Sequence, residues 1–218
     1  MEIFLRMIDF NLHKIFVEGK TDQSFIQFVL EKQFGIILND NQVNNAIINC
    51  QGWSNIQNQT GILLDKIRTE NNGKNIVIFD ADGKSNDGGF KKRKTELENI
   101  AKKIGITFDI FLFPDDQSDG DLELFYSSCF KNDKAFFKDC WNNMYSCLDG
   151  NKKHLELKFP KSAEMVFSYV DLFQEYKSEE YKNTKSKRSY FDENLWEFDF
   201  EKNEYLKKLI SFLKEHLK

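Results

Sequence analysis

The chain has 218 residues, 40% of them hydrophobic and 30% charged, which is ordinary for a globular protein with one substantial core or a core and an appendage. The formal net charge of −4 argues against a protein that coats polyanions in general, but it permits a local basic surface beside an acidic site. No apolar run approaches the roughly 18 residues of a membrane helix. Charged residues interrupt the first ten positions and exclude a signal peptide, so a cytoplasmic location is the default expectation.

Hydrophobic patterning predicts that strands and helices alternate over the first 130 residues. In chain order we expect a strand at 13–17, a helix at 22–34, a strand at 45–50, a helix at 56–68, a strand within 75–82, a helix at 90–104 and a strand at 108–114. The segment "NIVIFDAD" (75–82) holds the clearest strand, because its continuous apolar run is typical of burial on both faces. This alternation predicts the α/β class, with a mainly parallel central sheet and helices on both faces.

The rest of the chain is expected to be mostly helical, with helices at 136–148, 162–176 and 205–217. The polar, unpatterned segment 176–194 is expected to be a mobile surface loop. We therefore expect an α/β core over residues 1–130 and a mostly helical C-terminal extension over 131–218, packed on that core.

The four cysteines form no C-x-x-C pair and are spread through apolar segments. Cys140 and Cys147 are seven residues apart, on one face of a predicted helix. This pattern indicates buried thiols rather than zinc ligands or a disulfide.

Acidic residues follow three of the four predicted strands. Glu18 follows the first, Asp80 and Asp82 end the third, and the segment after the fourth contains Asp115, Asp116, Asp119, Asp121 and Glu123. The carboxyl ends of parallel strands meet at one edge of a sheet, where ligands of such folds bind. The sequence thus predicts that these acids converge on one rim.

The spacings suggest which acids can share a cation. Asp80 and Asp82 are two apart, so in extended backbone both side chains point to the same side. A tight turn separates Glu18 from Asp22, which also lies in the first turn of a helix and suits its dipole. Asp121 and Glu123 diverge where a helix begins, which favours Glu123 as a ligand and Asp121 as an N-cap that can also reach a metal.

Each acid also has a plain structural explanation. Glu18 and Asp22 suit a helix cap, and the aspartates of 114–121 suit a surface turn. Their joint placement at successive strand ends favours a metal site instead, because so many neighbouring carboxylates repel one another without a cation. Ligands that are all oxygen favour Mg²⁺ or Mn²⁺ over zinc.

These segments resemble the motifs of the Toprim (topoisomerase–primase) domain. Its Glu-Gly after the first strand is matched by "VEGKTD" (17–22), and its Asp-x-Asp after the third strand by "IFDAD" (78–82). The further "GDLE" (120–123) is similar to the third acidic motif of Toprim domains in OLD-family (overcoming lysogenization defect) nucleases, and the whole order resembles small stand-alone Toprim-like proteins of unknown function. The resemblance covers about residues 12–130 and implies a Toprim-like fold.

The resemblance implies Mg²⁺- or Mn²⁺-dependent phosphodiester chemistry on nucleic acid, as in a nuclease or phosphodiesterase. Glu18 would be a metal ligand or general acid/base, Asp80 and Asp82 metal ligands, and Asp22, Asp121 and Glu123 would complete a second metal position. The chain has no Walker A sequence, so a partner such as an ATPase would act in trans. The alternative is a non-catalytic module that binds a nucleotide or metal and regulates a partner protein.

Basic residues provide candidate contacts to phosphates. Lys91, Lys92 and Arg93 begin the helix that follows the Asp80–Asp82 motif, where a solvated helix face is the competing explanation. Lys185 and Lys187 lie in the polar segment 176–194 and could close over a substrate. OLD-type sites use a lysine beyond the acidic motifs, for which Lys158, Lys161, Lys185 and Lys187 are equivalent candidates. Trp53 follows another strand and could stack on a base or serve packing alone.

Overall fold

The computed structural model describes residues 8–83, 87–151, 159–175 and 188–217, and these form two compact units. The first unit comprises Met1–Leu122 together with Glu204–Lys218, and the second comprises Glu123–Asn203. The division therefore differs from the boundary expected at residue 130. It falls eight residues earlier, and the last helix returns to the first unit instead of belonging to a C-terminal extension.

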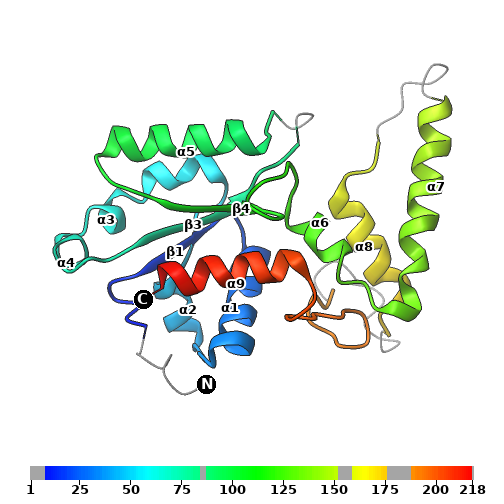
Figure 1. The fold of residues 1–218 in the computed structure, drawn as a ribbon, viewed down its shortest axis with the longest axis horizontal. Helices are drawn as coiled ribbons and strands as arrows, with labels where there is room; N and C mark the ends of the chain where they lie inside the picture. Colours follow the sequence, from blue (N-terminus) through cyan, green and yellow to red (C-terminus); the bar gives the residue numbers. More distant parts are fainter. Residues whose placement is uncertain (1–7, 84–86, 152–158, 176–187, 218) are drawn as a thin grey trace. The chain divides into compact units, whose positions relative to one another are not determined.

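A four-stranded, all-parallel sheet forms the centre of the first unit (Figure 1). Its strand order is β2-β1-β3-β4, and every neighbouring pair is parallel. The strands are β1 (Lys14–Val17), β2 (Ile47–Asn49), β3 (Asn75–Asp80) and β4 (Asp109–Phe113). The prediction of an α/β fold with a parallel central sheet is confirmed, and this architecture is consistent with a Toprim-like fold.

Helices cover both faces of this sheet. Figure 1 shows α3 (Thr60–Leu63) and α5 (Phe90–Ile104) on one face, and α1 (Lys20–Phe34), α2 (Asp40–Ala46) and α9 (Glu204–His216) on the other. On the α5 face, alternate strand residues such as Phe16, Val77 and Phe79 pack with Leu97 of α5 and Leu63 of α3.

On the opposite face, rings from three elements hold the layers together. The Phe113 ring meets Phe25 of α1 at 5.9 Å between centroids, and the Phe111 ring meets Phe212 of α9 at 5.4 Å. Aromatic burial of this kind supplies much of the free energy that stabilises a core. It explains why the last helix of the chain belongs to the first unit.

The helix expected at 56–68 is instead three short pieces, η1 (Trp53–Asn58), α3 and α4 (Lys66–Glu70). Asp65 starts α4, because its side chain accepts a hydrogen bond from the Arg68 N–H at 3.3 Å. The buried Arg68 side chain then donates hydrogen bonds to the backbone carbonyls of Leu12, Ile62 and Lys74. These bonds break the continuous helix that the apolar spacing favoured.

The described part of the second unit is mostly helical, as expected for the C-terminal portion. It contains η3 (Asn132–Lys134), α7 (Phe136–Asn151) and α8 (Ser162–Phe173), while α6 (Leu122–Ser127) begins at the boundary between the units. Its core is aromatic: Phe130 stacks on Tyr169 at 3.8 Å between centroids, and Trp196 lies 5.2 Å from Tyr169. Most of the polar segment 176–194, namely residues 176–187, lies outside the described residues.

The expectation of buried thiols at Cys140 and Cys147 is wrong, because both are exposed on α7. The ring contacts of α7 involve Phe137, Trp141 and Tyr145, which lie at intervals of four residues, and Phe136 at the start of the helix. The buried cysteines are Cys50 and Cys129. Among the described residues, no helix combines the length and apolar character required to cross a bilayer.

Candidate metal centre at the carboxyl ends of the strands

The order of the strands creates a topological switch point between β1 and β3. The chain leaves β1 through α1 and α2 towards β2, and it leaves β3 through α5 towards β4, on the other side of the sheet. The two crossovers use opposite faces of the sheet, so the segments that follow β1 and β3 part from each other (Figure 1). In open α/β sheets this is the place where ligands bind.

Glu18 lies at this switch point, immediately after β1. Its Oε1 accepts a hydrogen bond from the backbone N–H of Asp80, the last residue of β3, at 3.0 Å. Burial raises the pKa of Glu18 to about 7; the Asp80 N–H and Arg93 oppose this shift, whereas Asp22 and Asp82 add to it. The structure thus brings together two of the three acidic strand ends that the sequence indicated.

Asp22 is in the first turn of α1 and is only 8% exposed. Its Oδ2 accepts a hydrogen bond from the Gly19 N–H at 3.0 Å, which satisfies a donor at the start of the helix. Burial raises the pKa of Asp22, and the hydrogen bonds from backbone N–H groups oppose this shift. Asp22 therefore caps α1, and its charge raises the pKa of Glu18.

Asp80 is partly buried at the end of β3. Its Oδ1 accepts a hydrogen bond from the backbone N–H of Leu122, the first residue of α6, at 2.9 Å. The carboxylate thereby meets the positive end of a helix, where negative charge is favoured. This contact joins the β3 end to the acidic segment that follows β4.

Asp82 departs from the expected geometry, because β3 ends at Asp80 and Asp82 has a left-handed backbone with φ 58°. The prediction that Asp80 and Asp82 point to the same side of an extended chain is therefore wrong, because the chain is not extended at Asp82. The backbone carbonyl of Asp82 accepts a hydrogen bond from the Gly120 N–H at 2.9 Å. On the other side Gly88 packs so closely that a Cβ there would lie 2.3 Å from the Asp82 Cβ.

We use the name carboxylate rim for Glu18, Asp22, Asp80 and Asp82, which the first unit gathers around the switch point. Two other acids, in the segment after β4, bind helices of the first unit. Asp119 caps α5 by accepting from the Phe90 N–H at 2.8 Å, and Asp115 pairs with Lys208 of α9 at 2.9 Å. Both aspartates therefore have structural roles in the first unit, although the sequence predicted only a surface turn for this segment.

Asp121 and Glu123 lie at the boundary between the units. Asp121 is partly buried and directly precedes α6, whereas Glu123 is in the first turn of α6 and is the first residue of the second unit. Their roles as ligands stay predictions. The carboxylate rim therefore includes only carboxylates of the first unit.

The rim supplies only oxygen donors, which fits the chemistry of Mg²⁺ or Mn²⁺. Its side chains, however, are directed at protein donors rather than at one common point. Within the described part of the chain, no group of three or more His, Cys, Asp or Glu side chains is arranged to hold a metal ion. The donor set fits a divalent cation, and binding would require the side chains to turn towards it.

Arg93, which the sequence offered as a phosphate contact beside the site, binds one of the rim carboxylates. Lys91 and Lys92 are exposed on α5, as expected for phosphate contacts or for a solvated face, but Arg93 is only 2% exposed. Its Nη2 donates to Asp82 Oδ2 at 2.7 Å, and its guanidinium lies over the Trp53 ring, 3.9 Å from the centroid. Trp53 therefore packs on Arg93, which is one of the two roles predicted for it.

The remaining basic candidates lie outside the described residues or in the second unit. Lys158, Lys185 and Lys187 lie outside the described residues. Lys161 is exposed at the N-cap of α8, in the second unit.

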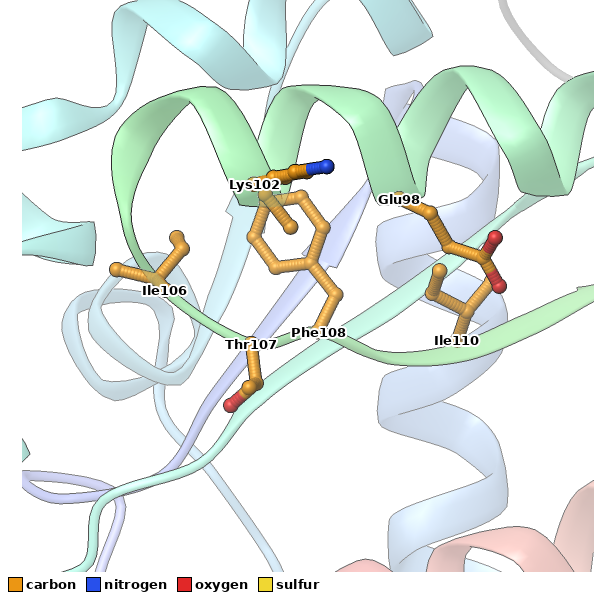
Figure 2. A pocket seen from close by; sticks show the side chains of 7 residues that line it. Glu98, Lys102, Ile106, Thr107, Phe108 and Ile110 are labelled. Carbon is orange, nitrogen blue, oxygen red and sulfur yellow. The ribbon is translucent and has the colours of Figure 1, made fainter.

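A shallow hollow lies at the other end of the strands. It is lined mainly by apolar groups from the carboxyl-terminal half of α5 and the chain leading into β4, including Ala101, Ile106, Phe108 and Ile110 (Figure 2). Because α5 runs back along the sheet, this hollow is near the amino end of β4 and away from the carboxylate rim. It shares no residue with the rim.

The fold and the rim define an α/β protein with a parallel sheet and an acidic switch point. A family model described as "Protein of unknown function (DUF3226)" matches residues 12–217, so the chain belongs to this family. No curated protein and no solved structure gave a significant match.

Proposed function

We propose that the protein carries out Mg²⁺- or Mn²⁺-dependent phosphodiester chemistry on nucleic acid, as a Toprim-type nuclease, alone or with a partner protein such as an ATPase. One observation carries the proposal: the acids that follow β1 and β3 meet at the switch point, where Glu18 Oε1 accepts the Asp80 N–H at 3.0 Å. Ligands bind at this place in open α/β folds. The order of the acids also agrees with the resemblance to Toprim domains.

The carboxylate rim would hold the metal. A divalent cation bound there would activate water and stabilise the leaving oxygen in an in-line displacement. Glu18 is the candidate general acid/base, because burial and the charges of Asp22 and Asp82 raise its pKa to about 7 and a backbone donor holds its carboxylate. Asp80 and Asp82 are the candidate ligands, and the exposed Lys91 and Lys92 would contact phosphates of the substrate.

The test is cleavage of labelled single- and double-stranded DNA and RNA with Mg²⁺, with Mn²⁺ and with EDTA. We expect cleavage of at least one substrate with metal, and its loss in Glu18→Gln and Asp80→Asn, which retain an acceptor for the Asp80 and Leu122 N–H groups. Asp119→Asn is the matched control, since Asp119 caps α5. Intact substrates under every condition, or unchanged cleavage by Asp80→Asn, would remove the nuclease assignment.

A second candidate is a non-catalytic module that binds a nucleotide or metal and regulates a partner protein. The contact between Arg93 and Asp82 favours it, because a protein cation already neutralises part of the rim. Under this alternative the wild-type protein binds Mn²⁺ or a Mn²⁺–nucleotide complex but leaves all four nucleic acids intact. Metal-dependent cleavage that is lost in Glu18→Gln excludes it.

A further inference from the structure

Strand β4 is an edge strand of the central sheet, because β3 is its one neighbour there. Along a strand, the N–H and C=O of one residue point to one side and those of the next residue point to the other. The Phe113 carbonyl accepts the Ala81 N–H at 3.1 Å on the side of β3, so the backbone groups of Leu112 and Ile110 point away from β3. The outer edge of β4 therefore carries hydrogen-bonding groups that the sheet does not use.

The structure caps one end of this edge and leaves the other end open. Asp116 Oδ1 accepts the Leu112 N–H at 3.2 Å, and the Leu112 carbonyl accepts the Asp116 N–H at 2.7 Å. Among the described residues, no hydrogen bond reaches the outward groups of Ile110 or Phe108. The Phe108 carbonyl points outward because the Asp109 N–H, in the same trans peptide plane, points towards β3. Open backbone groups of this kind pair with an added strand.

The shallow apolar hollow lies beside this open end of β4. Phe108 and Ile110, both half-buried, form part of its lining, and its volume is about 350 Å³. Two exposed side chains of α5 border it, with Lys102 over Phe108 and Glu98 over Ile110 (Figure 2). A strand added to β4 would therefore cover this apolar surface as well as pair with the backbone.

A second copy of the chain fits the open edge in antiparallel register. A two-fold axis at Asp109 places Phe108 of each copy opposite Ile110 of the other, so that the open backbone groups bond to one another. The register centred on Ile110 would instead place Phe108 opposite Leu112, whose outward groups are occupied by Asp116. The cap thus favours the axis at Asp109.

The charges at the hollow are complementary in this same register. Because Lys102 lies beside Phe108 and Glu98 beside Ile110, the axis places Lys102 of each copy opposite Glu98 of the other. Complementary charges across an interface fix its register and disfavour other partners. The edge, the hollow and the two charges therefore fit a copy of the same surface.

One like-charge contact opposes the pairing. Asp109 would face Asp109 of the partner copy on the other face of the sheet, where directly opposed like charges are destabilising. Each of these carboxylates already has its own partners, Lys74 Nζ at 3.9 Å and His216 Nδ1 at 3.2 Å. These partners offset the repulsion between the two copies.

We propose that the open edge of β4 joins two copies of this chain into a symmetric dimer, in which the two sheets become continuous and the two hollows close over each other. Antiparallel pairing directs the carboxyl ends of the two sheets in opposite directions, so each copy keeps its own carboxylate rim. The inference is independent of the proposed chemistry and of metal binding.

The experiment measures the mass of the full chain by sedimentation equilibrium over a range of concentrations. Wild type should dimerise, and Lys102→Glu and Glu98→Lys should each weaken dimerisation by about tenfold or more, because each places like charges opposite one another. Neutral substitutions such as Glu98→Gln should have little effect, since solvent-exposed ion pairs contribute little. An equal mixture of Lys102→Glu and Glu98→Lys should dimerise as wild type does, because every charge then faces its opposite.

Lys103→Glu is the matched control, because Lys103 is an exposed lysine of α5 that does not line the hollow. It makes the same change of charge as Lys102→Glu and should dimerise as wild type does. Amide hydrogen exchange reports on the strand itself. The Ile110 N–H should exchange more slowly in the wild-type dimer than in Lys102→Glu at a concentration where that variant is monomeric.

Recovery of the dimer in the mixture, together with slow exchange of the Ile110 N–H, supports the inference. Wild type that is monomeric at every concentration would overturn it, and a protected Ile110 N–H in that monomer would mean that another part of the chain covers the edge. A wild-type dimer that both charge reversals leave unchanged, or one in which the Ile110 N–H exchanges as fast as in the monomer, would place the interface elsewhere and would also overturn it.

Discussion

Glu18→Gln should make the protein more stable at alkaline pH, because the buried carboxylate of Glu18 costs free energy when it ionises. The residue is partly buried, and this burial raises its pKa from 4.5 to about 7, with a contribution from the charges of Asp22 and Asp82. Glutamine keeps an oxygen to accept the Asp80 N–H but carries no charge. The substitution thus removes the ionisation and preserves the hydrogen bond.

The magnitude follows from linkage between protonation and folding. A pKa raised from 4.5 to about 7 corresponds to about 3 kcal/mol. Because the folded state binds the proton more tightly than the unfolded state, the contribution of Glu18 is fully present below pH 4.5 and is lost as pH rises through about 7. The stability difference between Glu18→Gln and wild type should therefore grow with pH and level off near 3 kcal/mol above about pH 8.

The assay is urea unfolding of both proteins at several pH values between 5 and 8.5, followed by circular dichroism, with EDTA present to remove cations. Glu98→Gln, an exposed position on α5, is the matched control and should follow wild type. A stability difference between Glu18→Gln and wild type that does not change with pH would refute the reasoning. It would mean that Glu18 ionises in the folded protein as easily as in water.

Two further predictions concern backbone packing and a buried histidine. Gly88→Ala should destabilise the protein by about 1–3 kcal/mol and abolish Mn²⁺ binding, because the new Cβ would overlap Asp82. Gly61→Ala is the control and should change neither property, because the space around Gly61 is open. Equal stabilities of the two variants in urea unfolding would contradict the prediction. Burial lowers the pKa of His13, whose Nδ1 accepts the Lys74 N–H, so stability should fall as pH drops through 6.5. His13→Gln should reduce that loss in urea unfolding, and an equal loss in both proteins would count against it.

The parallel sheet was predictable because its signals are local. The sequence shows the continuous apolar run of β3 and the helical spacing of apolar residues in α5. Helix α5 begins and ends at the expected residues, Phe90 and Ile104. The break in the helix expected at 56–68 was not visible, because it depends on the hydrogen bonds of Arg68 to distant carbonyls. Tertiary contacts thus overrode the apolar spacing there.

The candidate site was predictable to a similar extent. The alternation of strands and helices places Glu18 and Asp80 at one edge of the sheet, and the structure joins them. The left-handed backbone of Asp82 was not predictable from its own segment, because the contacts of Asp82 include a hydrogen bond from Gly120 in another loop. Two signals were available but weak: the Gly88-Gly89 pair, which indicates close backbone approach, and an arginine among lysines.

The burial of Arg93 could not be inferred from its own segment. "KKRK" (91–94) reads as a uniformly solvated run, and only the packing of Trp53 against α5 distinguishes the third residue from the others. Aromatic and acidic partners from separate elements decide which charge is buried. The spacing of residues within one helix does not reveal these partners.

The measurement that tests the central claim most directly is the Mn²⁺-dependent change in melting temperature of wild type, Glu18→Gln, Asp82→Asn and the control Asp119→Asn. At 100 times the dissociation constant, a bound ion stabilises the folded state by about 2.7 kcal/mol, or several degrees in a domain of this size. We predict the full shift in wild type and Asp119→Asn and a much smaller one in Glu18→Gln and Asp82→Asn. Equal shifts in all four proteins, or none in wild type, would contradict a metal site at the carboxylate rim.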